Sequence, residues 1–199
     1  MANPSIPQTA PQDSVMASPA EVQAMQGWAG AAFADIAAPV AVPVTVRRQD
    51  HSTLHFGRSC LGTPLRIGDE HYAHGLGTHA NSELLVALPA GARAFAAAVG
   101  IDRNYDTNGQ RGSVEFSIAC GGNEIFHSPL LRGSDGPLPV RVDLPAGTTE
   151  LVLKVDATPD GAGWDQADWA DARFLLADGT AMYLDEGRVD RKSTRLNSS

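Results

Sequence analysis

Apolar and polar residues alternate along most of the chain after residue 43, with the period of two that is typical of half-buried β-strands. Segments with this pattern lie at 44–48, 53–56, 83–88, 93–99, 113–119, 124–127, 138–144, 149–155 and 172–176. Turn signals separate these segments, and no helical period intervenes. The pattern predicts an all-β fold, a jelly-roll β-sandwich over residues 40–178.

Glycine-rich turns mark several of the predicted strand ends. The segment 116–126 has Gly121, Gly122 and Asn123 near its centre, which predicts a β-hairpin. The tetrapeptide Leu-Pro-Ala-Gly occurs at Leu88 and again at Leu144, so two strands are expected to end in similar turns.

The two ends of the chain have different patterns from the middle. Residues 1–17 are rich in Pro, Ser and Gln and predict a disordered segment. A Ser-Pro-Ala-Glu start at Ser18 and apolar residues at helical spacing predict an amphipathic helix and linker over 18–38. The basic stretch 186–199 lacks any strand or helix period and resembles a translated vector scar, with a disordered basic tail as the alternative.

Composition excludes several classes of protein. The chain has 199 residues, 43% of them hydrophobic, and a formal net charge of −8. An acidic chain is a poor partner for nucleic acid, and no apolar run is long enough to span a membrane, so neither partner is expected. Residues 1–17 have no charged and apolar regions of the signal-peptide kind. Cys60 and Cys120 allow one disulfide or two buried thiols, and we favour thiols.

One polar segment has the composition of a cation-binding loop. Asp102, Asn104, Asp106 and Asn108 place carboxylates and amides at every second position. This spacing allows several oxygens to surround a hard cation such as Ca²⁺. The alternative is a turn whose side chains bond their own backbone. The candidate metal ligands are Asp102, Asn104, Asp106 and Asp165.

A second segment, 160–171, combines carboxylates with two indoles. An indole can pack on the apolar face of a sugar while neighbouring carboxylates and amides bond its hydroxyls. Trp164 follows two glycines and is expected to be exposed, whereas Trp169 leads into a strand and is expected in the core. The candidate sugar-binding residues are Trp164 and Tyr105 for stacking, and Asn104, Gln166 and Asp168 for hydroxyls.

The sequence lacks the layout of an enzyme. It has no nucleophile elbow, phosphate loop or zinc-peptidase helix. Five of the six histidines lie between His51 and His79, but in a glycine-rich stretch without the spacing of a zinc site. We expect a structural, hydrogen-bonded role for His79. A small hydrolase would need two carboxyl groups facing each other across a deep cleft, which a small sandwich hardly offers.

Four ordered motifs resemble one family. They are Tyr-Ala-His-Gly-Leu-Gly-Thr-His-Ala-Asn-Ser from Tyr72, Val-Gly-Ile-Asp from Val99, Gly-Ser-Val-Glu-Phe from Gly112 and Asp-Gln-Ala-Asp-Trp-Ala-Asp-Ala from Asp165. Together they resemble the NPCBM domain, the "novel putative carbohydrate-binding module" attached to glycoside hydrolases, whose characterised members form carbohydrate-binding module family 51. The resemblance implies a galactose-binding-domain-like jelly roll without catalytic activity. It also implies galactose-containing glycans as ligands and often a bound calcium.

The family signature is matched residue by residue at Gly75, Gly77, His79, Ser82, Asp102, Asp165, Asp168, Trp169 and Asp171. Gln166 departs from the family, which commonly has His there, and the loop from Asp102 to Gly112 is longer than its usual acidic turn. The expected partners are a glycan and a catalytic domain in a longer parent protein, with the module monomeric and extracellular or periplasmic. The alternative is a structural or adhesion module that docks a neighbouring domain without binding glycan.

Overall fold

The computed structural model describes Ser18 and residues 41–186, and apart from Ser18 these belong to one unit, Pro39–Ser199. All regular elements in this described part are β-strands, and none of its segments forms a helix capable of crossing a membrane. The predictions for residues 1–17, for the helix within 18–38 and for the basic tail beyond Glu186 lie outside the described residues.

Fourteen strands are found in the described residues: β1 (Val44–Gln49), β2 (His55–Phe56), β3 (Leu65–Ile67), β4 (Glu70–Tyr72), β5 (Gly75–His79), β6 (Ser82–Ala87), β7 (Ala92–Ile101), β8 (Ser113–Cys120), β9 (Asn123–His127), β10 (Leu131–Arg132), β11 (Leu138–Asp143), β12 (Glu150–Ala157), β13 (Gln166–Leu176) and β14 (Ala181–Tyr183). The prediction of an all-β sandwich is confirmed.

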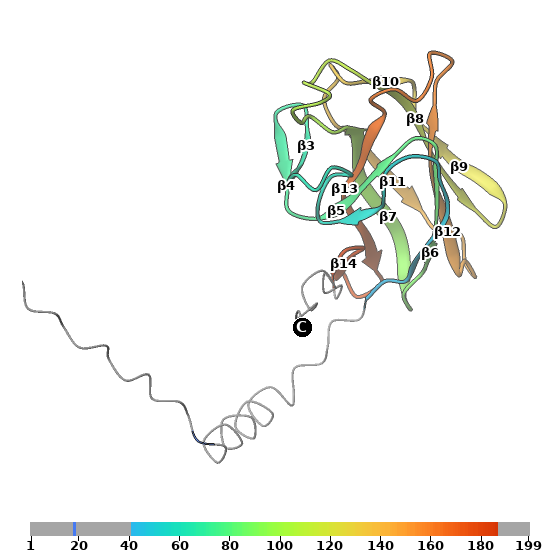
Figure 1. Cartoon of the computed structure of the whole chain (residues 1–199). Coiled ribbons are helices and arrows are strands. Elements are labelled where there is room, and N and C mark those ends of the chain that lie inside the picture. The colour runs from blue at the N-terminus through green and yellow to red at the C-terminus, as the bar shows by residue number, and fades with distance from the viewer. Residues whose placement is uncertain (1–17, 19–40, 187–199) are drawn as a thin grey trace, which may run out of the picture. The chain divides into compact units, whose positions relative to one another are not determined.

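Two antiparallel sheets form the sandwich (Figure 1). One sheet has the order β1-β6-β12-β8-β10, with β9 also paired to β8. The other has the order β11-β7-β13-β5-β2, with β14 paired to the end of β13. A separate hairpin of β3 and β4 lies beside the second sheet. The long strands run between two sets of loops, so one end of the sandwich gathers 102–112 and 158–165 while the other gathers 88–91 and 144–149.

Aromatic side chains join the two sheets at the centre of the core. Trp169 on β13 is fully buried and meets Phe116 on β8 edge to face, with ring centroids 5.0 Å apart. Phe95 on β7 contacts Trp169 at 6.3 Å and Phe174 at 5.7 Å. Such edge-to-face pairs add to the burial energy of the rings. The prediction that Trp169 belongs to the core is confirmed.

Several local predictions are also confirmed. The segment 116–126 forms the β8–β9 hairpin, and Gly121 and Gly122 both have positive φ in its turn. Cys60 and Cys120 are free and buried, and burial raises the pKa of the Cys60 thiol to about 12. Both features agree with two inert thiols rather than a disulfide.

Strands at 65–67, 70–72 and 75–79 and the first half of β13 were not predicted, because their polar or glycine residues hide the alternation. Residues 166–170 are buried on both faces of the sheet. The outer face is covered by the backbone of Ser59 and the side chain of Ile67. A Cβ added at Gly77 would lie within 2.5 Å of Ser59 atoms, and a Cβ added at Gly100 would lie within 2.5 Å of an Ile67 atom. These two glycines flank Asp168 in the pairing of β13 with β5 and β7. Glycine on both sides therefore lets the cover close over this carboxyl group.

Candidate functional site

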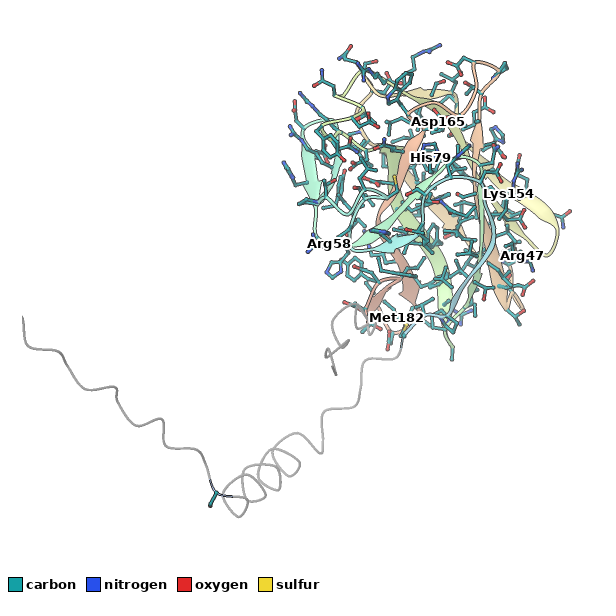
Figure 2. The ribbon with its side chains drawn as sticks, viewed as in Figure 1. Arg47, Arg58, His79, Lys154, Asp165 and Met182 are labelled. Atoms are coloured by element: carbon teal, nitrogen blue, oxygen red, sulfur yellow. The ribbon has the colours of Figure 1, made fainter. Side chains whose placement is uncertain are left out.

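The loops that hold the predicted site residues meet at one end of the sandwich. Asp102 N donates to the carbonyl of Gln166 at 2.7 Å, and Ala80 N donates to the carbonyl of Asp165 at 3.0 Å. These bonds extend the sheet into the loops, because Gln166 pairs with His79 at the end of β5. Figure 2 shows His79 and Asp165 at this same end. The site therefore rests on a rigid strand framework.

A chain of amide and carboxylate groups shapes the loop 102–112. The Oδ1 atom of Asn104 accepts from the backbone N–H groups of Asp106 and Thr107, at 2.9 and 3.1 Å, which fixes the orientation of its amide. The Nδ2 atom then donates to Asp102 Oδ1 at 2.5 Å and to Gln166 Oε1 at 2.6 Å. Gln166 Nε2 donates onward to Asp106 Oδ2 at 2.6 Å. Each donor thus has an acceptor, and the loop is held in one conformation.

Trp164 is the exposed indole of the site. Its side chain is 47% exposed, in agreement with the sequence prediction, and its backbone adopts a φ of 65°, which few residues other than glycine do. The carbonyl of Trp164 accepts from Gln166 N at 2.8 Å, which anchors it at the start of β13. The guanidinium of Arg111 lies 5.1 Å from the ring centroid. Tyr105, 81% exposed, lies on the same loop as Arg111.

Two carboxyl groups lie behind this surface with no exposure. Asp102 Oδ2 accepts from Arg66 N at 3.1 Å, whereas neither oxygen of Asp168 meets a donor in the described residues. Burial, followed by the charge of Asp102, raises the pKa of Asp168 well above its ordinary value. A protonated Asp168 can donate to Asp102, so one proton serves the pair. Burial therefore favours the protonated, uncharged form of Asp168.

Asp165 is buried at the edge of the site. Its Oδ1 atom accepts from Ser113 N at 2.8 Å, and its Oδ2 atom has no partner in the described residues. Burial is the main cause that raises the pKa of this carboxyl to about 6, and the nearby charge of Asp160 adds to the effect. Asp160 itself accepts from Ser113 Oγ and Thr158 Oγ1, which lowers its pKa.

The four predicted metal ligands do not form a single oxygen cage. Both oxygens of Asp102, the Asn104 oxygen and one oxygen of Asp106 accept hydrogen bonds from the protein, and Asp165 bonds Ser113 instead. Across residues 41–186, no three His, Cys, Asp or Glu side chains are grouped so that they could hold a metal ion. Ca²⁺ takes six to eight oxygens, so these residues, as arranged, do not fit the ion. Asp165 Oδ2 is a buried oxygen of this set without a donor in the described residues.

His79 has the structural role that the sequence predicted. Its Nδ1 atom lies 2.8 Å from the carbonyl of Ala80 and therefore carries the proton, which leaves Nε2 as an acceptor. Burial lowers the pKa of His79, which keeps the ring neutral. The exposed ring of His51 lies 5.3 Å away, edge to face.

The predicted sugar-binding residues therefore divide into two groups. Trp164 and Tyr105 are exposed and Asn104 is half-buried, so a ligand can reach them. Gln166 and Asp168 are buried, and this corrects the expectation that they bond sugar hydroxyls directly. Gln166 instead holds the loop through Asn104 and Asp106, and Asp168 lies near Asp102 with no exposed surface.

Sequence reasoning missed Arg111 and its contact with Trp164, since the two residues come from different loops and no local pattern joins them. Two concave surfaces, of ≈ 430 and ≈ 370 Å³, lie at the opposite end of the sandwich and share residues 147–149. Residues of the turns and strand ends line them, among them Leu88, Arg93 and Glu150. Neither has an exposed aromatic ring of the kind that Trp164 presents.

Comparisons with known proteins agree with this fold. A family model described as "NPCBM/NEW2 domain" matches residues 41–175. A "Putative endo-alpha-N-acetylgalactosaminidase" from Renibacterium salmoninarum is 33% identical over 117 residues, which are 58% of this chain and 7% of that protein. The chain therefore spans a small part of this relative.

Two solved structures are similar in fold. The CBM51-2 and INT domains of Clostridium perfringens ZmpB, in complex with GlcNAc, have a TM-score of 0.60 and 28% identity, covering 68% of this chain and 30% of that one. CBM51 from Clostridium perfringens GH95, in complex with methyl-galactose, has a TM-score of 0.58 and 25% identity, covering 66% of this chain and 92% of that one. Nearly the whole of the second neighbour thus matches the sandwich.

Proposed function

Because the chain belongs to the NPCBM/NEW2 domain family, we propose that it is a non-catalytic carbohydrate-binding module, that its ligand is a galactose-containing glycan, and that the glycan binds around Trp164. The exposed indole on a fixed loop is the single observation that carries the location of the site. The C–H face of a galactose residue presents the apolar surface that an indole prefers.

Polar groups around the indole suit the hydroxyls of a sugar. Tyr105 offers a second exposed ring on the loop 102–112, where Asn104 and Asp106 are half-buried. His79 presents an acceptor nitrogen at the same end of the sandwich, because its Nδ1 proton is engaged by Ala80. A shallow site with one stacking ring binds weakly, and we expect a Kd of roughly 0.1–1 mM.

The choice of galactose is supported by one neighbour and by the general family function. CBM51 from GH95 was solved with methyl-galactose, and nearly all of that chain matches the sandwich. The ZmpB neighbour was solved with GlcNAc, so a single family fold accommodates more than one sugar. The sugar preference of this chain therefore rests on its own loops, where Gln166 and the long 102–112 segment depart from the family pattern.

A module of this kind raises the effective concentration of an attached enzyme at its polymer. We propose that the module belongs to an extracellular glycoside hydrolase, as the relative from Renibacterium salmoninarum suggests, and that the sandwich itself is monomeric. Asp102, Asp165 and Asp168 have no exposed surface, so none of the three can reach a glycosidic bond.

A glycan array on the purified chain tests the proposal. Binding to galactose-terminated glycans that is lost in Trp164→Ala supports it. Val46→Ala, which shortens an exposed apolar side chain on the edge strand β1, should bind as the wild type does and serves as the control. Absence of binding to every glycan by a folded chain would contradict the proposal and favour a module that docks a neighbouring domain.

The same array, repeated with added calcium and with a chelator, tests the calcium that the family resemblance implies. Binding that weakens in chelator would support a calcium role in which the Asp165 Oδ2 atom takes part. Binding that is indifferent to chelator would agree with the hydrogen-bonded arrangement of Asp102, Asn104 and Asp106.

A further inference from the structure

Two arginines beside the exposed indole have no carboxylate partner. Arg111 and Arg132 are exposed, and within residues 41–186 neither forms an ion pair. Other arginines at this end of the sandwich form ion pairs: Arg66 and Arg103 both reach Asp69, at 3.1 and 2.6 Å. Arg111 and Arg132 thus leave two unpaired positive charges at the end of the sandwich that holds Trp164.

Close backbone packing holds these residues together. Gly133 N donates to the carbonyl of Gly112 at 3.1 Å, so the segment after Arg132 lies directly against the segment after Arg111. A Cβ at Gly133 would lie 2.3 Å from the carbonyl oxygen of Arg111, and a Cβ at Gly112 would lie 2.3 Å from that of Trp164. No side chain fits at either contact. Arg111, Arg132 and Trp164 are thus fixed on three backbone segments that touch one another.

The guanidinium of Arg111 keeps most of its donors free. It lies over the Trp164 ring, with Cζ 5.1 Å from the centroid, and Nη1 donates to the backbone carbonyl of Asp106 at 3.2 Å. A guanidinium has five N–H donors in its plane, and stacking on a ring leaves that plane open to hydrogen bonds. At least one edge of the fork can therefore receive a ligand oxygen.

Nearby carboxylates are occupied by other donors. Asp106 accepts from Gln166 Nε2, and Asp135 accepts from the backbone N–H of Arg132 at 2.7 Å rather than from its side chain. Asp160 accepts from the hydroxyls of Ser113 and Thr158, although the charge of Arg132 helps to lower its pKa. Asp106, Asp135 and Asp160 thus accept hydrogen bonds from other groups, and none of them forms an ion pair with the two guanidinium groups.

Resting on the proposed function, we infer that the glycan carries an anionic substituent, a sulfate ester or a sugar carboxylate, and that Arg111 binds it while the sugar ring contacts Trp164. Arg132 supplies a second positive charge on the adjoining segment. A planar guanidinium matches the paired oxygens of sulfate and carboxylate better than the single oxygen of a hydroxyl. Arg111 is therefore a specificity-determining residue for acidic over neutral galactosides.

The test is calorimetric titration of the whole chain with three matched oligosaccharides: a neutral galactoside, the same galactoside bearing a sulfate ester, and its sialylated form. We expect one anionic form to bind about tenfold more tightly than the neutral one at low salt, and the advantage to shrink as salt is added. Arg111→Gln should abolish the advantage. Arg93→Gln removes an exposed arginine without an ion pair at the opposite end and should leave it intact.

Each other outcome overturns a distinct statement. Equal affinity for the neutral and anionic forms would overturn the inference and leave the glycan-binding proposal unaffected. An equal loss of affinity for both forms in Arg111→Gln would have the same meaning. Absence of binding to all three, from a folded chain, would overturn the proposed function itself. If Arg111→Gln does not fold, Arg132→Gln and the salt dependence of the wild type decide the question, and a preference unaffected by both would contradict the inference. The sulfate and sialic arms identify which oxyanion is recognised.

Discussion

Trp164 and Trp169 lie five residues apart and have opposite environments: the first indole is 47% exposed and the second is fully buried. The carbonyl of Trp164 bonds the first residue of β13, and Trp169 occupies the centre of the core on the same strand. One short segment therefore links the surface proposed to bind the glycan directly to the core of the sandwich. The backbone of Trp164 is held by this bond.

Trp164→Ala is expected to abolish glycan binding and leave folding intact. The residue is 47% exposed and lies outside the core, so its removal costs less packing energy than that of Trp169, whereas the sugar loses its stacking ring. Calorimetry measures the affinity, and thermal unfolding measures stability. A variant that binds as tightly as the wild type would show that the glycan lies elsewhere.

Trp169→Ala is expected to destabilise the domain by about 3–5 kcal/mol, because the cavity cannot be refilled between two packed sheets. The rings of Phe116 and Phe95 would both lose an edge-to-face partner. Urea unfolding followed by circular dichroism measures the loss. A change of less than about 1 kcal/mol would mean that the core relaxes around the missing indole, contrary to this expectation.

Gly112→Ala is expected to displace Trp164 and weaken binding. Gly112 has a φ of 93°, and a Cβ there would lie 2.3 Å from the carbonyl oxygen of Trp164. Gly147→Ala is the matched control, since Gly147 has a φ of 82° but nothing within 4 Å of the new atom. Both variants carry the cost of positive φ, about 1 kcal/mol, but only the first adds a clash with backbone. Equal stability and equal binding in the two variants would contradict the close approach.

Sequence alone predicts the sheets well and the site only in part. Segments such as 113–119 and 149–155 alternate because one face meets the core, and this pattern is local. Asp168 violates the pattern: it is a carboxyl group buried on the outer face of β13, under a cover that depends on Gly77 and Gly100 of the neighbouring strands. Burial of this kind results from contacts between distant segments. The residue type alone therefore led to the prediction that Asp168 is accessible to a sugar.

Contacts between distant segments also decide what the side chains of the loop 102–112 bind. The alternating oxygens of Asp102, Asn104 and Asp106 suit a cation in sequence, but the structure places amide donors between them. These donors are the side-chain amides of Asn104 and of Gln166, and Gln166 lies on β13, far from the loop in sequence. Two backbone N–H groups fix the orientation of the Asn104 amide. Trp164 was predictable because two glycines precede it, whereas its contact with Arg111 arises only when the loops meet.

Asp165 gives the module a pH-dependent stability of unusual sign. Its carboxyl is buried, one oxygen has no partner, and its pKa is raised to about 6 from an ordinary value of 3.8. Between these values the unfolded chain has already lost the proton while the folded chain retains it, so stability from this group is lost as pH rises from about 4 to about 6. The loss amounts to at most about 3 kcal/mol and is complete above the folded pKa.

Asp165→Asn should remove this dependence, because the amide oxygen can still accept from Ser113 N and nothing titrates. The free energy of unfolding, measured by urea at several pH values, should shift in favour of the variant between pH 4 and 6 and differ from the wild type by a constant above that range. Asp178→Asn is the control of opposite sign, because hydrogen bonds from Thr180 lower the pKa of Asp178 below its ordinary value of 3.8. The wild type should gain stability over this variant as pH rises to about 4, and the difference should then be constant from pH 4 to 6. A difference between Asp165→Asn and wild type that is flat from pH 4 to 6 would mean that the carboxyl finds a partner, a water or a cation, which holds its pKa at the ordinary value.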